Sequence, residues 1–176
     1  MKKNMLLWQF AGFTITVALG SLLHFLFSWT GAYALAPISA VNESTWEHMK
    51  ILFFPMLIFA CAQYYFFQPD YEGFWWIKGI GTLVGVISIP VLFYTFNGAF
   101  GKTPDWLNIT FFFISAAIGY FVETLLFRKG FTLPYSWVPF ASLLVMQTLF
   151  IVFTFYPPQL PLFQDPVTGL YGIVME

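Results

Sequence analysis

The sequence predicts an all-α membrane protein, a bundle of five transmembrane helices with the N-terminus inside the cell and the C-terminus outside. Hydrophobic residues make up 59% of the chain and charged residues only 9%. A soluble domain contains nearer 45–50% apolar and about 25% charged residues, so lipid must be the solvent for most of this surface. The apolar residues lie in long runs without the period-two alternation of a lipid-facing β-barrel, which favours helices.

Five segments are long enough to cross a bilayer, which takes roughly 20 mostly apolar residues in a helix. The tail, residues 157–176, has prolines at positions 157, 158, 161 and 166 and is expected to form turns on the outer surface. The expected spans are about 5–27, 48–67, 79–97, 106–127 and 135–156, in a single transmembrane domain of residues 1–176.

The first span has a second interpretation, a cleaved secretory signal. Lys2 and Lys3 precede an apolar run that is followed by the small residues Ala34 and Ala36, as in a signal with its cleavage site. The hydrophobic region of a signal is about 7–15 residues long, and this run is longer. The length therefore favours a retained membrane helix.

Lysine and arginine in the connections predict the orientation, because cytoplasmic loops carry an excess of both. The tryptophans fall near the predicted span ends, as the side chains of an interfacial aromatic belt do. These features predict a multi-pass protein of the cytoplasmic (plasma) membrane. With the N-terminus inside, the inner cations are Lys2, Lys3, Lys78, Arg128 and Lys129, and the outer cations are Lys50 and Lys102.

Small residues predict where the helices approach each other, since lipid provides little hydrophobic drive for helix association. Gly12, Thr16, Gly20 and His24 recur every four residues and so share one side of the first span. His24 is thereby expected to face neighbouring helices at the outer end of the bundle.

Ionisable residues are concentrated just before the second span, in "VNESTWEHMK". Glu43, Glu47 and Lys50 are spaced i, i+4 and i+7, which would place them on one face of a helix. Together with polar residues at other outer span ends they predict an extracytoplasmic pocket that binds a lipid or small-molecule ligand or is purely structural. The candidate residues are His24, Asn42, Glu43, Glu47, His48, Lys50, Tyr94, Asp105 and Asp165.

Helix capping explains part of this cluster. Ser44 and Glu47 match the S-x-x-E capping box, Asn42 is an equally good N-cap, and Val41 would then pack on Trp46. Capping leaves His24, His48 and Lys50 unexplained.

A metal site would explain the two histidines that capping leaves without a role. Its candidate ligands are His24, Glu43, Glu47 and His48. Imidazole and carboxylate suit zinc or a related divalent ion, and an open coordination position would activate water. The protein would then be a metal-dependent membrane hydrolase acting on a lipid or lipid-linked substrate. The spacing differs from H-E-x-x-H, and a metal-free network in which His48 and Lys50 offset the glutamates is the simpler interpretation.

Glu123 in the fourth span is the second candidate. Its simplest partner is a cytoplasmic-side cation, namely Lys78, Arg128 or the N-terminal lysines. The alternative is a proton or cation relay in a small transporter or channel-like subunit. That relay would need a deeper polar group such as Gln63 or Gln147.

The sequence also excludes several classes of function. A net charge near −1 without a basic stripe gives no sign of nucleic-acid binding. Cys61 is the only cysteine, so the chain has neither an internal disulfide nor a thiolate metal cluster.

The stretch "PISAVNESTWEHMKILFFP" resembles the signature of an uncharacterised family of small bacterial multi-pass membrane proteins, known only as a domain of unknown function. The stretches "HFLFSW", "FYTFNGAFGK" and "LFQDPVTGLYG" agree with that family in the same order along the chain. The resemblance implies a bacterial membrane protein with five helices and implies no activity.

Overall fold

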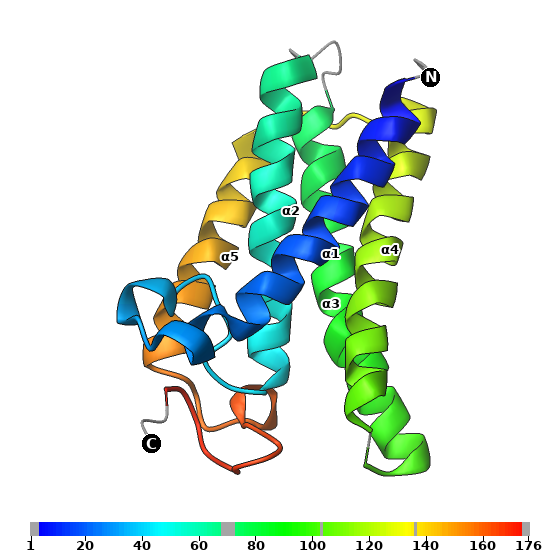
Figure 1. Ribbon diagram of the computed structural model, residues 1–176. Helices are drawn as coiled ribbons and strands as arrows, with labels where there is room; N and C mark the ends of the chain where they lie inside the picture. The colour runs from blue at the N-terminus through cyan, green and yellow to red at the C-terminus, as the bar shows by residue number, and fades with distance from the viewer. Residues whose placement is uncertain (1–3, 68–72, 103, 136, 174–176) are drawn as a thin grey trace.

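The protein is a bundle of five α-helices in the computed structural model, which describes residues 4–67, 73–102, 104–135 and 137–173 (Figure 1). Each helix is long and apolar enough to cross a membrane, so the predicted fold class and number of spans are confirmed. The helices are α1 (Asn4–Thr30), α2 (Thr45–Phe67), α3 (Phe74–Phe100), α4 (Asp105–Lys129) and α5 (Trp137–Phe155), with the 3-10 turns η1 (Tyr33–Leu35) and η2 (Pro161–Phe163).

Four of the helices extend beyond the apolar runs that predict them, whereas α5, Trp137–Phe155, is slightly shorter than its predicted span of about 135–156. The largest difference is in α3, which begins at Phe74, whereas the hydropathy predicts a span from about residue 79. Trp75, Trp76 and Lys78 interrupt an apolar run, yet aromatic and long charged side chains are compatible with helical geometry. Composition therefore locates the membrane-embedded part of each helix better than its ends.

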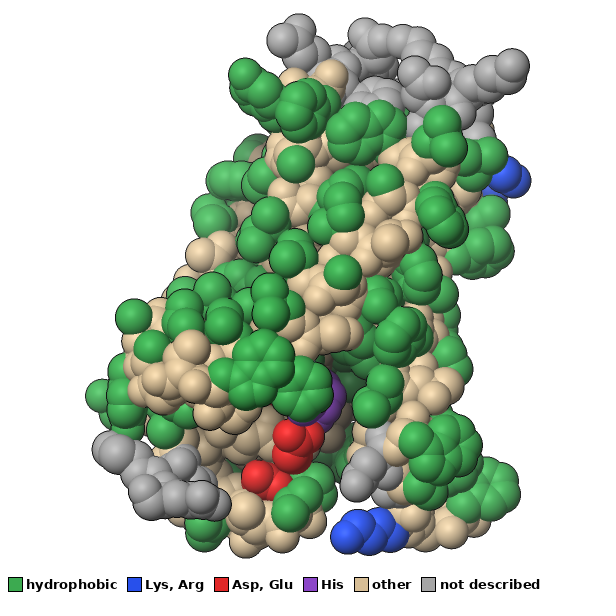
Figure 2. Space-filling view, viewed as in Figure 1, with side chains coloured by type: hydrophobic (Ala, Val, Ile, Leu, Met, Phe, Trp, Pro, Cys, Tyr) green, Lys and Arg blue, Asp and Glu red, His purple; other side chains and the backbone are tan. Residues whose placement is uncertain are grey.

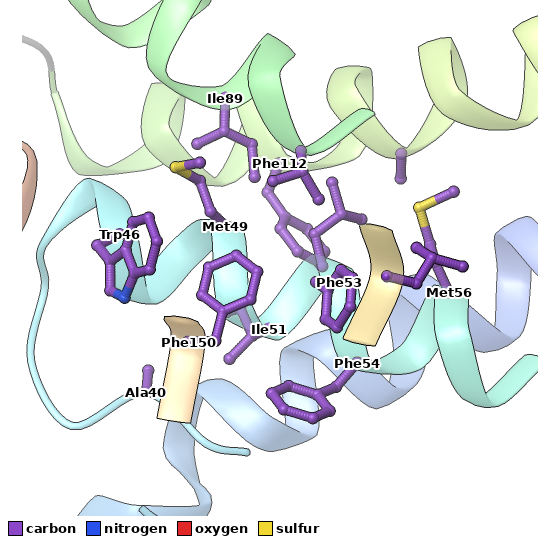
Figure 3. Packing of buried hydrophobic residues seen from close by; sticks show 14 of the residues in the cluster. Ala40, Trp46, Met49, Ile51, Phe53, Phe54, Met56, Ile89, Phe112 and Phe150 are labelled. Atoms are coloured by element: carbon purple, nitrogen blue, oxygen red, sulfur yellow. The ribbon is translucent and has the colours of Figure 1, made fainter. Parts of the chain in front are cut away.

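The central helix of the bundle is α2. In its most apolar stretch 61% of the residues are buried inside the protein, against 22–39% in the other four helices. Phe53 and Met56 of α2 are fully buried, and Phe53 packs against Phe150 of α5 (Figure 3). In lipid this core is stabilised by close packing and dispersion more than by the exclusion of water.

Trp46 departs from the predicted aromatic belt. Its indole is buried, with ring centroids 4.6 Å from Phe150 and 4.7 Å from Phe163 of η2. The tail after α5 folds back under the start of α2 and covers this ring, which is why it does not reach the membrane interface. Trp29 and Trp106 are exposed, as members of a belt would be.

Glycines mark the closest helix contacts, as the sequence predicts. A Cβ on Gly119 of α4 would lie 2.9 Å from the carbonyl oxygen of Gly81 of α3, and one on Gly20 of α1 would lie 2.4 Å from the Phe112 ring of α4. Any side chain at these positions would force the helices apart. Close approach of α1 and α4 brings the C-terminal part of α1 beside α2 and α4.

The two chain termini lie at opposite ends of the bundle, as an odd number of spans requires (Figure 1). The α1–α2 connection, residues 31–44, lies at the same end as the tail. On the face shown in Figure 2, charged side chains are found near the two ends and the middle is covered by apolar side chains. This distribution matches a protein whose middle zone faces lipid.

The glycine contact between α3 and α4 predicts opposite effects for two Gly-to-Ala substitutions in α3. Gly81→Ala places a Cβ about 2.2 Å from Glu123 Cγ and is expected to destabilise the protein by about 1–3 kcal/mol through overpacking. Gly98→Ala meets no atom within 4 Å and is expected to leave the stability unchanged or raise it by up to about 1 kcal/mol, because alanine is the better helix former. Thermal unfolding in detergent measures both. Equal effects would contradict this contact.

Candidate functional site

The N-terminus of α2 is capped by side chains from the loop before it. The backbone N–H of Glu47 donates to Ser44 Oγ (3.3 Å), which is one half of the predicted capping box. In the other half of a capping box, Glu47 would accept from the N–H of Ser44. Here Asn42 Oδ1 accepts from that N–H (2.9 Å), and Glu47 Oε2 accepts from the N–H of Val41 instead (3.0 Å). Ser44 and Asn42 therefore share the capping that the sequence assigned to either one.

Lys50 holds Glu47 away from its expected place in the polar site. The buried ammonium of Lys50 lies 2.5 Å from Glu47 Oε2 and donates to Ala36 O and Thr154 Oγ1, both at 2.8 Å. All three of its protons thus have acceptors, from the α1–α2 connection, α2 and α5. Lys50 and Glu47 are structural groups inside the bundle and do not line its mouth.

Glu43 does not share a helical face with Glu47 and Lys50, contrary to the i, i+4, i+7 prediction. Because α2 begins at Thr45, Glu43 lies in the loop, and only Glu47 and Lys50 have helical spacing. His48 is one residue past Glu47 and therefore about 100° around the helix. This rotation directs His48 toward α1 and Glu43.

His24, Glu43 and His48 converge at the end of the bundle that carries the tail (Figure 1). Glu43 Oε2 lies 3.4 Å from His24 Nε2 and 3.8 Å from His48 Nε2, and one ligand atom from each of the three residues lies within 4.8 Å of the others. The imidazoles belong to α1 and α2, and their centroids are 5.2 Å apart in an edge-to-face arrangement. We call these three residues the His–Glu–His cluster.

The ring of His48 is oriented by its own helix. His48 Nδ1 lies 2.9 Å from the carbonyl oxygen of Ser44, which can only accept, so we assign the proton to Nδ1. The lone pair of Nε2 then points toward Glu43. A backbone carbonyl in this position is what orients many metal-binding histidines. His24 Nδ1 is buried without a hydrogen-bond partner among the described residues.

Glu43 is the acidic member of the cluster, and its side chain is 48% exposed. The hydrogen bond from His24 lowers the pKa of Glu43 below its usual value, while partial burial opposes it. The carboxylate form is therefore favoured at neutral pH.

The donor types of the cluster suit a divalent metal ion, and the three ligand atoms, which lie within 4.8 Å of one another, would have to move closer together to bind one. In tetrahedral zinc sites with Zn–N bonds of about 2.0–2.1 Å, neighbouring ligand atoms lie about 3.3 Å apart. The His24–Glu43 separation of 3.4 Å already matches this value, and the His48–Glu43 separation of 3.8 Å needs only a small side-chain movement. Two imidazoles and one carboxylate leave one coordination position for water or substrate.

Two spaces adjoin the cluster. An apolar groove of about 100 Å³ between α1, α2 and α4 has His24 and His48 at one end. A second hollow of about 380 Å³, which we call the polar hollow for its charged and amide groups, has Glu43 on its wall. It is also lined by Asn97, Lys102 and Asn108 and by the apolar Phe93, Pro166 and Val167. In Figure 2 a histidine and acidic side chains lie beside a hollow at this end, with a basic side chain on the opposite rim. Sequence reasoning missed Asn108, because an asparagine one turn inside α4 has no distinguishing spacing.

The other predicted site residues lie around the cluster. Asp165 is buried in the tail, where its Oδ1 accepts from the N–H groups of Val167 and Thr168 and its Oδ2 lies 3.4 Å from the N–H of Glu43. Asn42 Nδ2 donates to the carbonyl oxygen of Gly172 (2.9 Å). These contacts fasten the loop that carries Glu43. Tyr94 is exposed on α3 and lines neither space, and the side chain of Asp105 lies outside the described residues.

The family model for a family of unknown function, DUF6512, matches residues 1–173. The chain belongs to this family. The expectation of an uncharacterised family is thereby confirmed. No curated protein and no solved structure matches the chain. Membership of DUF6512 carries no activity, so the function has to be argued from the site itself.

Glu123, the second candidate, pairs with Lys78 in the opposite half of this DUF6512 bundle. Both side chains are fully buried, and the Lys78 ammonium also lies 5.2 Å from the Tyr120 ring centroid. Of the cations that the sequence offered as partners of Glu123, the structure pairs it with Lys78. The pair lies inside the bundle and not at its surface, where the sequence placed it. Tyr120 in turn shares a 2.8 Å hydrogen bond with Thr16, which links α1 to α4.

The Lys78–Glu123 pair predicts strongly non-additive effects of substitution. Lys78→Met leaves a buried carboxylate without its cation and is expected to cost about 3–5 kcal/mol of stability. Adding Glu123→Leu is expected to restore most of the loss, since a buried ion pair is often replaceable by apolar side chains. Thermal unfolding in detergent is the measurement, with the exposed Lys129→Met as control. Losses that simply add would contradict a direct pairing.

Proposed function

We propose that the protein is a divalent-metal-binding protein of the bacterial plasma membrane, with the metal in an extracytoplasmic pocket. The observation that carries this proposal is the convergence of His24, Glu43 and His48 from a helix end, a loop and a helix start. Glu43 and His48 flank the start of one helix, but His24 is 19 positions before Glu43, so its placement beside them is a property of the tertiary fold.

Zinc is the ion that suits this donor set best. Two neutral imidazoles and one carboxylate form the ligand set of several catalytic zinc sites, whereas structural zinc sites have four protein ligands. The open fourth position would hold a water molecule whose pKa the ion lowers toward neutrality. Hydrolysis is therefore the class of reaction that we propose, with a lipid or lipid-linked molecule as the substrate class.

The charge distribution supports an extracytoplasmic position for the cluster. Lys78 and Lys50 are both neutralised in buried ion pairs, so each side of the predicted topology loses one cation from its count. The inner side keeps Arg128 and Lys129 besides the N-terminal Lys2 and Lys3, which lie outside the described residues, and the outer side keeps Lys102. The excess of cations remains on the side opposite the cluster, as cytoplasmic loops require.

Metal content tests the proposal directly. We expect the protein, purified after exposure to zinc and freed of excess ion, to retain about one zinc per chain by elemental analysis. Glu43→Gln and His48→Ala each remove a ligand, and are expected to weaken binding by more than the roughly 10–100-fold that the loss of an outer-shell partner costs.

Glu47→Gln is the matched control for Glu43→Gln. It removes a carboxylate that pairs with Lys50 and not with the histidines, so it is expected to lower the thermal stability and keep the zinc. Wild-type protein without stoichiometric metal, or equal zinc in wild type and Glu43→Gln, would refute the metal site and leave a metal-free ion-pair network.

Cysteine labelling tests the orientation. In a Cys61→Ala background, Val167→Cys in the tail is expected to react with a membrane-impermeant maleimide in intact bacterial cells, because Val167 is 74% exposed at the cluster's end. Lys129→Cys at the opposite end is expected to react only after the membrane is permeabilised. The reverse pattern would place the cluster in the cytoplasm.

A further inference from the structure

We propose that the pocket binds an anionic phospholipid, with part of one acyl chain in the apolar groove, the phosphate near Lys102, and the chain–head linkage beside the His–Glu–His cluster. This inference rests on the proposed function only where it places the lipid linkage beside a bound metal ion. The lipid-binding surfaces themselves are formed by other residues, so they are testable without metal.

The apolar groove faces the lipid phase. It runs between α1 and α4, and its wall includes Phe25, Ile109 and Phe113, whose side chains are 47%, 59% and 40% exposed. These residues belong to helices that are apolar enough to span the membrane, so the groove opens sideways toward acyl chains and not toward water. Gly20 and Ser21 of α1 make the groove possible, since larger side chains there would occupy it.

The polar hollow provides the opposite environment. It lies at the end of the bundle that carries the tail, and its lining includes the exposed ammonium of Lys102 and the amide groups of Asn97 and Asn108. Asn108 Oδ1 is buried and has no hydrogen-bond partner among the described residues. A cation and amide groups at the membrane surface suit a phosphate and the hydroxyl groups of a lipid head.

The His–Glu–His cluster lies where the two spaces meet. His24 and His48 line the apolar groove, and Glu43 lines the polar hollow. A third, small space of about 20 Å³ between α2, α3 and α4 is lined by both Glu43 and His48, and shares Phe112 with the groove and Asn108 with the hollow. A molecule that occupies both spaces must therefore have its apolar–polar junction at the cluster.

Charge and shape together favour a phospholipid over a soluble anion. A soluble phosphate compound would use Lys102 and leave the groove unused. A neutral lipid would use the groove and offer no anionic group to Lys102, while the Glu43 carboxylate in the same hollow already lies 3.4 Å from His24 Nε2. Only an anionic amphiphile satisfies both spaces at once. The ester linkage of a phospholipid would then lie within reach of the ion that His24, Glu43 and His48 are proposed to hold.

Lipid binding is testable with a fluorescent short-chain phosphatidylglycerol and purified metal-free protein in detergent, using fluorescence polarisation. Ser21→Phe fills the groove and is expected to reduce affinity at least tenfold. Lys102→Gln is expected to reduce it about fivefold and to abolish any preference over phosphatidylcholine with the same chains, since one lysine near an anionic head group contributes on the order of that factor. Glycerol phosphate, the head without chains, is expected to compete weakly.

Ser142→Phe is the matched control, because Ser142 lines a different apolar groove between α3 and α5 and no charged residue is among the groove's lining side chains. It is expected to bind the lipid as wild type does. Measuring the zinc content of Ser21→Phe separates the two proposals. A variant that retains zinc but no longer binds the lipid has lost the groove and kept the metal site. Equal affinity in wild type and Ser21→Phe, equal loss in Ser142→Phe, or competition by glycerol phosphate as strong as by lipid would each overturn the lipid proposal.

Discussion

The contacts of the buried Lys50 ammonium are the interaction on which the half of the molecule that carries the tail depends. It joins three parts of the chain, through Ala36 before α2, Glu47 within α2 and Thr154 in α5. A buried charge persists only when it is paired and its hydrogen bonds are satisfied, so these contacts have to form together. Because Lys50 pairs with Glu47, Glu43 is the one of the two glutamates around the start of α2 that contacts the histidines. The position of α5 and the composition of the cluster thus follow from one side chain.

Composition predicted the spans because membrane helices have to be apolar over a fixed length, which is a property of sequence alone. It could not predict lateral burial. Lys78 has the sequence position of a cytoplasmic surface cation, yet it is inside the bundle beside Glu123. Trp46 has the position of an interfacial tryptophan, yet the tail covers it. In both cases the decisive partner comes from a distant part of the chain.

The sequence identified His24, Glu43 and His48 as candidates but could not tell which of the two glutamates meets the histidines. His24 was expected to face its neighbours from the four-residue repeat of small residues, and that repeat does lie against α2 and α4. Glu43 and Glu47 were indistinguishable by sequence, because the first residue of a helix is uncertain by one or two positions. A start at Thr45 places Glu43 in the loop, where it meets the histidines, and Glu47 in the helix, where it meets Lys50.

The fastening of the tail to the loop has a consequence for how the molecule matures. Asp165 and Gly172, which hold the backbone of Glu43 and the side chain of Asn42, leave the ribosome after all five helices. These contacts of the loop that carries Glu43 can therefore form only after the last helix and the tail have been synthesised. Any ion or lipid would be captured after assembly, which separates membrane insertion from the acquisition of chemistry.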